Sequence, residues 1–241
     1  MTPGVIWYRV ADETHNGDGR HISYLKKSAK NVKSRIRASK MTMTLDSGIV
    51  TRTSMMPSQK IVFQDQDRSI TALEKADLLP GAVYWNERIA PPRSRWFDGA
   101  LDKTASCDLV FVDPDNGVAS SRACAEGSPK HVFLDEIRSL VERKSRPSVV
   151  IYHQVDHLSD TAEEKTERQL ERLSSELGLS LAERPFGVLF RRWSVRAFLI
   201  LPSRDHRQML LERTRALVQK WGKDEWKTGK PRGHFTGPIP I

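Results

Sequence analysis

The hydrophobic positions in the second half of the chain predict strands and helices in alternation. Two short apolar runs, 108–112 and 148–152, have the length and the β-branched residues of buried parallel strands. The segments 130–143 and 161–177 carry apolar residues three or four positions apart, which is typical of amphipathic helices. Gly178 predicts the end of the second helix. The four segments together predict two successive strand–helix units.

Two further apolar runs, 186–191 and 195–201, are separated by only three residues. So short a connection indicates an antiparallel hairpin, and a helix is predicted after it from about 204 to 221. The alternation as a whole predicts an α/β fold with a doubly wound, mostly parallel, Rossmann-like sheet. We expect helices on both faces of this sheet and an antiparallel hairpin at its C-terminal end.

The first half of the chain has weaker periodicity. Its patterns predict strands at 5–8, 60–63 and 83–85, and helices at 21–37, 70–76 and 93–101. The segment 39–59, rich in Met, Thr and Ser, is interpreted as an insertion or a flexible excursion. A chain of 241 residues can bury one substantial core. We therefore expect a single α/β domain over 1–221 and a basic tail with Gly and Pro over 222–241.

The composition narrows the class of protein. No apolar run approaches the roughly 18 residues needed to cross a bilayer, and the first residues lack the pattern of a signal peptide. The only cysteines, Cys107 and Cys124, have no metal-ligand spacing around them, so we expect neither a disulfide framework nor a cysteine zinc site. These features predict a cytoplasmic protein without a membrane partner. The sequence leaves the oligomeric state open.

The charge balance indicates a polyanionic partner. Lys and Arg number 39 against 30 Asp and Glu, a net charge of +9, which favours nucleic acid, with DNA and RNA both open. The candidate contacts combine cationic and stacking side chains: Arg93, Arg95, Arg191, Arg192 and Trp193. Trp96, in contrast, is expected in the core.

The richest candidate site is the sequence Asp113-Pro114-Asp115-Asn116-Gly117, directly after the predicted strand 108–112. In open α/β sheets, ligands bind outside the carboxyl ends of the strands. Tyr152 ends the next predicted strand, 148–152, and His153 follows it, so both are expected near the same cleft. His153 is a candidate base near neutral pH or a structural histidine. An ordinary turn is the alternative interpretation of the 113–117 segment.

A second candidate site is the loop after the first predicted strand. In doubly wound folds this loop holds the cofactor, and Gly17 and Gly19 would let the backbone approach a ligand closely. Asp12, Asn16 and Asp18 add polar groups to the same loop. A solvated loop remains the alternative interpretation. Asp65 follows the predicted strand 60–63 at the same edge of the sheet, and the alternative for it is an acid before a helix.

The order of elements over 105–203 resembles the second half of class I S-adenosylmethionine-dependent methyltransferases, in which a final antiparallel strand inserts into a parallel sheet. Asp113 and Pro114 match the start of the motif by which such enzymes hold an exocyclic amine. The adenine-N6 methyltransferases of DNA and ribosomal RNA are the nearest in topology and motif position. Asp115 and Asn116 stand where that family has a second proline and an aromatic ring.

The resemblance implies S-adenosylmethionine as the cofactor and no metal. It implies that the loop with Asp12, Asn16, Gly17, Asp18 and Gly19 binds the cofactor and that Asp65 binds its ribose hydroxyls. Asp113 would hold the target amine, while Asn116 and Tyr152 would shape the pocket. The function that the resemblance implies is methyl transfer to an exocyclic amine of a nucleic-acid base.

Two other functions remain open at this point. The carboxylates of Asp12, Asp18, Asp113 and Asp115 would suit Mg²⁺ in a metal-dependent nuclease or phosphohydrolase. Two or more of them within about 4–5 Å of one another would favour this alternative. A non-catalytic nucleic-acid-binding protein is the third possibility. The sequence does not decide whether the chain is catalytic.

Overall fold

The computed structural model describes residues 1–11, 69–119, 129–156, 160–192, 194–221 and 234–241. The chain forms two compact units, of which the larger consists of Met1–Val10 with Gly81–Ile241 and the smaller of Ala11–Pro80. The described part of the smaller unit contains the predicted helix α3 (Ile70–Lys75), which begins where the Ser69 side chain accepts a hydrogen bond from the Ala72 amide. The predicted segments 21–37, 39–59 and 60–63 lie outside the described residues.

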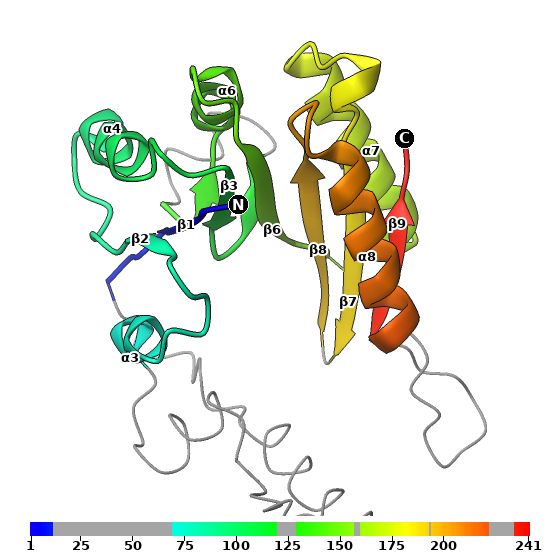
Figure 1. Ribbon diagram of the computed structural model, residues 1–241, viewed down its shortest axis with the longest axis horizontal. Coiled ribbons are helices and arrows are strands. Elements are labelled where there is room, and N and C mark those ends of the chain that lie inside the picture. Colours follow the sequence, from blue (N-terminus) through cyan, green and yellow to red (C-terminus); the bar gives the residue numbers. More distant parts are fainter. Residues whose placement is uncertain (12–68, 120–128, 157–159, 193, 222–233) are drawn as a thin grey trace, which may run out of the picture. The chain divides into compact units, whose positions relative to one another are not determined.

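A seven-stranded sheet organises the larger unit (Figure 1). Its order is β2 (Val83–Trp85), β1 (Pro3–Trp7), β3 (Leu109–Asp113), β6 (Ser148–Gln154), β8 (Ser194–Leu201), β7 (Phe186–Arg192) and β9 (Phe235–Ile239). The first four strands run parallel to one another, and β8 is antiparallel to both of its neighbours. The unit is therefore an α/β structure with a mostly parallel central sheet, as predicted, and with antiparallel strands at one side.

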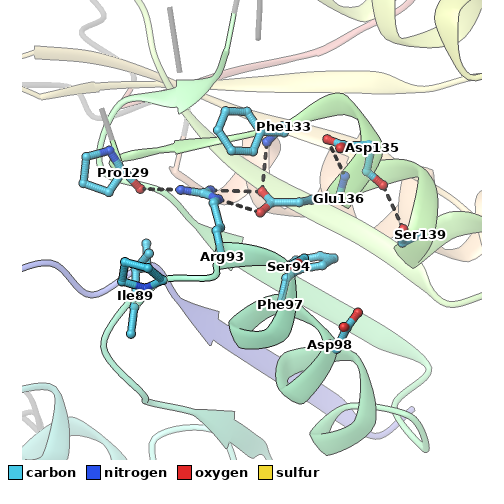
Figure 2. A pocket seen from close by; sticks show the side chains of 12 residues that line it. Ile89, Arg93, Ser94, Phe97, Asp98, Pro129, Phe133, Asp135, Glu136 and Ser139 are labelled. Carbon is cyan, nitrogen blue, oxygen red and sulfur yellow. Dashed lines mark hydrogen bonds and ion pairs between the residues drawn. The ribbon is translucent and has the colours of Figure 1, made fainter. Parts of the chain in front are cut away.

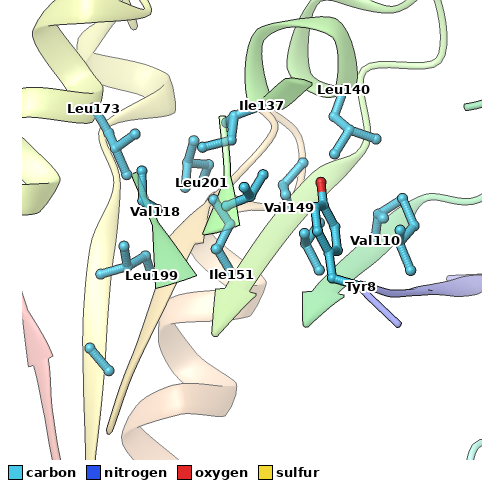
Figure 3. Packing of buried hydrophobic residues seen from close by; sticks show 14 of the residues in the cluster. Tyr8, Val110, Val118, Ile137, Leu140, Val149, Ile151, Leu173, Leu199 and Leu201 are labelled. Carbon is cyan, nitrogen blue, oxygen red and sulfur yellow. The ribbon is translucent and has the colours of Figure 1, made fainter. Parts of the chain in front are cut away.

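Three helices cover one face of the sheet: α4 (Arg93–Lys103), α6 (Leu134–Glu142) and α7 (Ala162–Glu176). Every second side chain of each strand points to this face and packs against the helices. Figure 3 shows Val110, Val149, Ile151 and Leu199 of the strands beside Ile137, Leu140 and Leu173 of the helices. Helix α8 (Arg207–Trp221) packs on the other face, where Leu211 contacts a cluster of Phe186, Val188 and Ile200. Two α-helices, α7 and α8, thus enclose the antiparallel side of the sheet (Figure 1).

Several element ends follow from local chemistry. Helix α7 begins at a capping box, in which the Thr161 hydroxyl accepts from the Glu164 amide and the Glu164 carboxylate accepts from the Thr161 amide. It ends before Gly178, whose φ of 64° is the left-handed conformation that glycine adopts freely. Both ends agree with the predicted helix 161–177.

Two predicted elements differ from the structure. The helix predicted from 130 begins at Leu134, because His131–Val132 forms the short strand β5, which pairs with β4 (Gly117–Val118). The predicted tail ends in the strand β9, which pairs with β7, so the last residues of the chain belong to the sheet. Among the described residues, no helix is long and apolar enough to cross a membrane.

Candidate functional site

The predicted site at residues 113–117 lies where the order of the strands in the sheet reverses. From β1 the chain goes to β2 on one side, whereas β3, the next strand of the large sheet, lies on the other side of β1. Open α/β sheets bind ligands outside the carboxyl ends of the strands at such a switch point. β1 ends at Trp7 beside Asp113, the last residue of β3, and the Tyr8 amide donates to the Asp113 carbonyl at 3.4 Å. The topology therefore places Asp113 at the expected ligand edge.

The strand register gives Asp113 an aromatic neighbour on each side. Val110 and Val112 point to the face covered by α4 and α6, so Asp113 points to the opposite face. Trp7 pairs with Asp113, and Val112 pairs with Ile151, which puts Tyr152 beside Asp113 when the register continues. Trp7, Asp113 and Tyr152 therefore lie on one face of three adjacent strands, at their carboxyl ends.

The carboxyl group of Asp113 is partly buried and has an altered acidity. Burial raises the pKa of Asp113 to about 6, and the negative charge of Asp115 adds to this effect. Within the described residues, no group donates a hydrogen bond to this carboxylate and no cation pairs with it. A carboxylate in this condition is an acceptor available to a ligand, and perturbed acids of this kind concentrate at functional sites.

Asp115 has a different environment, although it is only two residues away. Its carboxylate forms an ion pair with Lys130 at 3.1 Å, and the Asn116 amide donates to the Lys130 carbonyl. The next residues along both segments, Gly117 and His131, are the first pair of β4 with β5. Asp115 and Asn116 are therefore held at the β4–β5 pair. The two aspartates of the motif differ because, among the described residues, only Asp115 has a cation paired with it.

His153 lies on the face opposite to Tyr152, as strand alternation requires. Its Nδ1 accepts a hydrogen bond from the Val118 amide at 3.1 Å, so this nitrogen carries no proton. Burial, together with a smaller effect of the neighbouring His131, lowers the pKa of His153 to about 4. The side chain is therefore neutral and a weak base at neutral pH, which favours the structural interpretation of this histidine.

Gly117 is where the motif contacts His153. Its φ is 93°, and a β-carbon at this position would lie only 2.7 Å from the His153 Cα. Glycine is required here both for the backbone conformation and for the close approach of the two segments. The β4 segment thus rests on β6 through Gly117 and the Val118 amide.

Tyr152 is held in place by its neighbours in the sheet. Its hydroxyl accepts from Arg196 Nε at 3.1 Å, and its ring packs edge-on against Phe198 with centroids 6.2 Å apart. Phe198 also contacts Phe111, two residues before Asp113, at 6.4 Å between centroids. Aromatic side chains therefore extend across β3, β6 and β8 on the face to which Asp113 points.

A network of buried polar groups lies near this edge and was not predicted. The Glu136 carboxylate, 7% exposed, accepts hydrogen bonds from Arg93, from the Tyr8 hydroxyl at 3.0 Å and from the Phe133 amide. Arg93 also donates to the carbonyls of Pro129 and His131, and its guanidinium lies 4.1 Å from the Phe133 ring centroid. We call Tyr8, Arg93, Phe133 and Glu136 the Glu136 network.

The network forms part of the wall of a cavity of about 640 Å³ between the N-terminal ends of α4 and α6 (Figure 2). Apolar side chains such as Ile89, Phe97 and Phe133 line it together with Asp98 and Asp135. Its size is in the range of ligand pockets. Asp113 is not among its lining residues, so the cavity and the 113–117 motif are separate features of the carboxyl edge.

The candidate nucleic-acid contacts have varied environments. Arg93 is engaged in the Glu136 network, Arg191 pairs with Glu163, and Arg95 is exposed on α4. The Arg192 side chain and Trp193 lie outside the described residues. Trp96 is buried, as predicted, and donates from its indole nitrogen to the Glu87 carbonyl.

The predicted cofactor residues Asp12, Asn16, Gly17, Asp18, Gly19 and Asp65 lie outside the described residues. The described sheet identifies which strand lies beside β1. The strand beside β1 is β2, at 83–85, so the residues that follow it at the ligand edge are Asn86 and Glu87. Arg9 donates to Asn86, while Glu87 is exposed.

The described ranges contain no group of three or more His, Cys, Asp and Glu side chains arranged to hold a metal ion. Of the four aspartates in the magnesium alternative, Asp113 and Asp115 are described, and Lys130 pairs with Asp115. Comparisons of the chain with models of known protein families and with curated proteins each found no match. The functional interpretation therefore rests on the chemistry of the site.

Proposed function

We propose that this chain is an S-adenosylmethionine-dependent methyltransferase that acts on an exocyclic amine of a nucleic-acid base. The observation that carries the proposal is Asp113, a partly buried carboxylate at the topological switch point, without a described partner and with a pKa of about 6. A buried carboxylate without a partner lowers the stability of the fold. Its presence at the ligand edge of the sheet is explained if Asp113 binds a ligand there.

The strand order supports the proposal. β7 runs parallel to β6 because both are antiparallel to β8, which lies between them. An antiparallel strand inserted among parallel strands is the arrangement that the resemblance predicts, and β8 lies between β6 and β7 in this way. The strand β9, which pairs with β7, goes beyond that arrangement.

Asp113 would hold the amine. An ionised carboxylate accepts a hydrogen bond from an amine N–H, which orients the nitrogen lone pair away from the carboxylate and fixes the position of the base. The side chains of Trp7 and Tyr152, on the two neighbouring strands, are placed to contact a planar base. Because the ionised carboxylate is a stronger acceptor than the neutral carboxylic acid, activity is expected to rise as the pH rises through 6.

The cofactor supplies an activated methyl group. The described residues fit the amine-binding part of such a site, while the loop expected to hold the cofactor lies outside them. Glu87, the first acid after β2, follows the strand beside β1, and we propose it with Asp65 as a candidate for the ribose-binding acid that the resemblance implies. A carboxylate there can accept hydrogen bonds from both ribose hydroxyls.

The test combines calorimetric titration with S-adenosylmethionine and transfer of a labelled methyl group to total cellular DNA and RNA. Asp113→Ala is expected to keep cofactor affinity and to lower the transfer rate by about 100-fold, because the amine loses its acceptor. Asp115→Ala is the matched control, since Lys130 rather than the proposed substrate faces Asp115. This variant should stay active, with its pH midpoint below that of the wild type.

The absence of any cofactor binding would contradict the proposal. Binding of Mg²⁺ that disappears in Asp113→Ala would then support the nuclease alternative. Loss of transfer in Asp115→Ala equal to that in Asp113→Ala would contradict the role given to Asp113.

A further inference from the structure

Three segments meet at the edge of the sheet opposite to Asp113. They are the turn after α6, the short helix η1 (Leu181–Glu183) with Arg184, and the connection between β8 and α8. Val149 at the start of β6 pairs with Leu201 at the end of β8, and Ile200 pairs with Phe186 at the start of β7. The register therefore brings the three segments together, beside the first residues of β6, as Figure 1 shows.

These segments carry an excess of positive charge. Residues 142–146, 181–184 and 203–207 contain six Lys or Arg and three acids. Arg143 turns inward and donates to the Thr104 hydroxyl and the Cys107 carbonyl. We call the five others the amino-edge cluster: Lys144, Arg146, Arg184, Arg204 and Arg207.

Arg146 has a backbone conformation that does not suit its side chain. Its φ is 39°, in the left-handed region that favours glycine, within a turn that the Arg146 amide closes by donating to the Arg143 carbonyl at 2.8 Å. The side chain is 72% exposed, and its ion pair with Glu183 is long, at 3.5 Å. Because glycine would form this turn without strain, the arginine is explained by what its side chain binds.

Among the described residues, the other cations of the cluster have no acid as an ion-pair partner, although Arg207 donates from its Nε to the Arg184 carbonyl. The Glu183 carboxylate accepts from the Ser180 hydroxyl, and this bond, with the charges of Arg146 and Arg204, lowers the pKa of Glu183. Within the described part of the chain, the side chains of Lys144 and Arg184 have no hydrogen-bond or ion-pair partner. The cluster thus presents more positive charge than the acids beside it neutralise.

We propose that the amino-edge cluster binds the sugar–phosphate backbone of nucleic acid, without base specificity. Clustered Arg and Lys side chains that are free to pair with phosphates provide most of such binding. The inference takes from the proposed function only the class of the partner. The two edges are separated by the length of β6, about 20 Å at roughly 3.3 Å per residue. A duplex of more than about six base pairs, at about 3.4 Å each, therefore reaches both.

The test is fluorescence anisotropy of a labelled duplex of about 20 base pairs, as DNA and as RNA, titrated with the full chain over a series of salt concentrations and without S-adenosylmethionine. The triple variant Arg146→Gly, Arg184→Gln, Arg204→Gln is expected to lower the affinity by about 10- to 100-fold. The slope of log K against log salt concentration should fall by about two to three, which corresponds to two to three fewer counterions released on binding.

The control is the triple variant Arg168→Gln, Arg213→Gln, Arg215→Gln, which makes the same change in net charge on the exposed surfaces of α7 and α8. Its affinity is expected to change less than about threefold. Equal losses in the two triple variants, or an unchanged affinity in the first, would overturn the proposal.

Arg146→Gly by itself separates binding from folding. It is expected to keep or raise the melting temperature, because it removes the strain, and to lower the affinity for the duplex by about threefold. Arg146→Lys should restore the affinity. Duplex binding is measured without S-adenosylmethionine and methyl transfer is measured with it, so a failure of methyl transfer and a failure of the cluster give different results. A wild-type chain that binds neither duplex would also overturn the inference.

Discussion

Glu136 and Asp113 are two acids near the carboxyl edge of the same sheet, and their environments are opposite. Glu136 accepts hydrogen bonds from the side chains of Arg93 and Tyr8 and from the Phe133 amide. Asp113 has no described donor for its carboxylate, and burial raises its pKa to about 6. Tyr8 touches both sites, because its hydroxyl binds Glu136 while its amide binds the Asp113 carbonyl.

The difference teaches how to separate structural from functional charges in this chain. A buried acid whose acceptor sites are filled holds the fold together, and the Glu136 network joins β1, α4 and α6 in this way. A partly buried acid that is left without a donor weakens the fold and is retained for what it binds. The following predictions test this distinction.

The largest effect is expected from Glu136→Gln. The substitution removes the charge that Arg93 faces and leaves a partly buried guanidinium without its anion, so the free energy of unfolding should fall by about 4 kcal/mol. Urea denaturation measures it. The control is Glu142→Gln on the same helix, whose exposed pair with Arg138 should contribute less than about 0.5 kcal/mol. Similar losses in the two variants would contradict a structural role for the network.

Gly117→Ala is expected to have the next largest effect, about 3 kcal/mol of destabilisation. The added methyl group would overlap His153, and the φ of 93° is strained for alanine. Gly81→Ala is the control, because Gly81 has a φ of 73° with open space around it and reports the backbone strain alone, about 1 kcal/mol. If both variants lose the same stability, the contact with His153 does not hold the segment that follows Asp113.

Asp113→Asn is expected to stabilise the fold, by about 3 kcal/mol at pH 8, because each unit of pKa shift corresponds to about 1.4 kcal/mol. The folded pKa of Asp113, about 6, lies above the ordinary value of 3.8, so the wild type loses stability as the pH rises from 3.8 through 6. Asparagine does not titrate, and the gain should therefore disappear below about pH 4. Denaturation of both proteins across this range measures the difference. A variant no more stable than the wild type at pH 8 would remove the distinction between the two acids.

Much of the fold was predictable because the local sequence of several strands and helices has the hydrophobic pattern of that element. The apolar runs that became β3, β6 and the β7–β8 pair, and the helical spacing of α7, need no tertiary information. β9 was missed, because Gly237 and Pro238 interrupt it and only its pairing with β7 makes it a strand. The start of α6 was predicted too early for the same kind of reason, since β5 exists only through its contact with β4.

The candidate site was predictable in position and not in its contacts. Asp113 follows an evident strand, so its place at the ligand edge could be inferred. Strand alternation separates His153 from Tyr152, but which of the two shares a face with Asp113 depends on which face of β6 packs against α6, and the sequence does not show this. The bond between Arg93 and Glu136 joins residues 43 positions apart, and neither has a local pattern that indicates the other.

The position of β8 has a consequence for the synthesis of the chain on the ribosome. β6 receives its second neighbour only when β8 is made, and 39 residues separate Gln154 from Ser194. During that interval the apolar strand β6 has a free backbone edge, which invites pairing with other nascent chains. Helix α7 and β7 are made before this edge is closed. We therefore expect this stretch of translation to be where the chain depends most on chaperones.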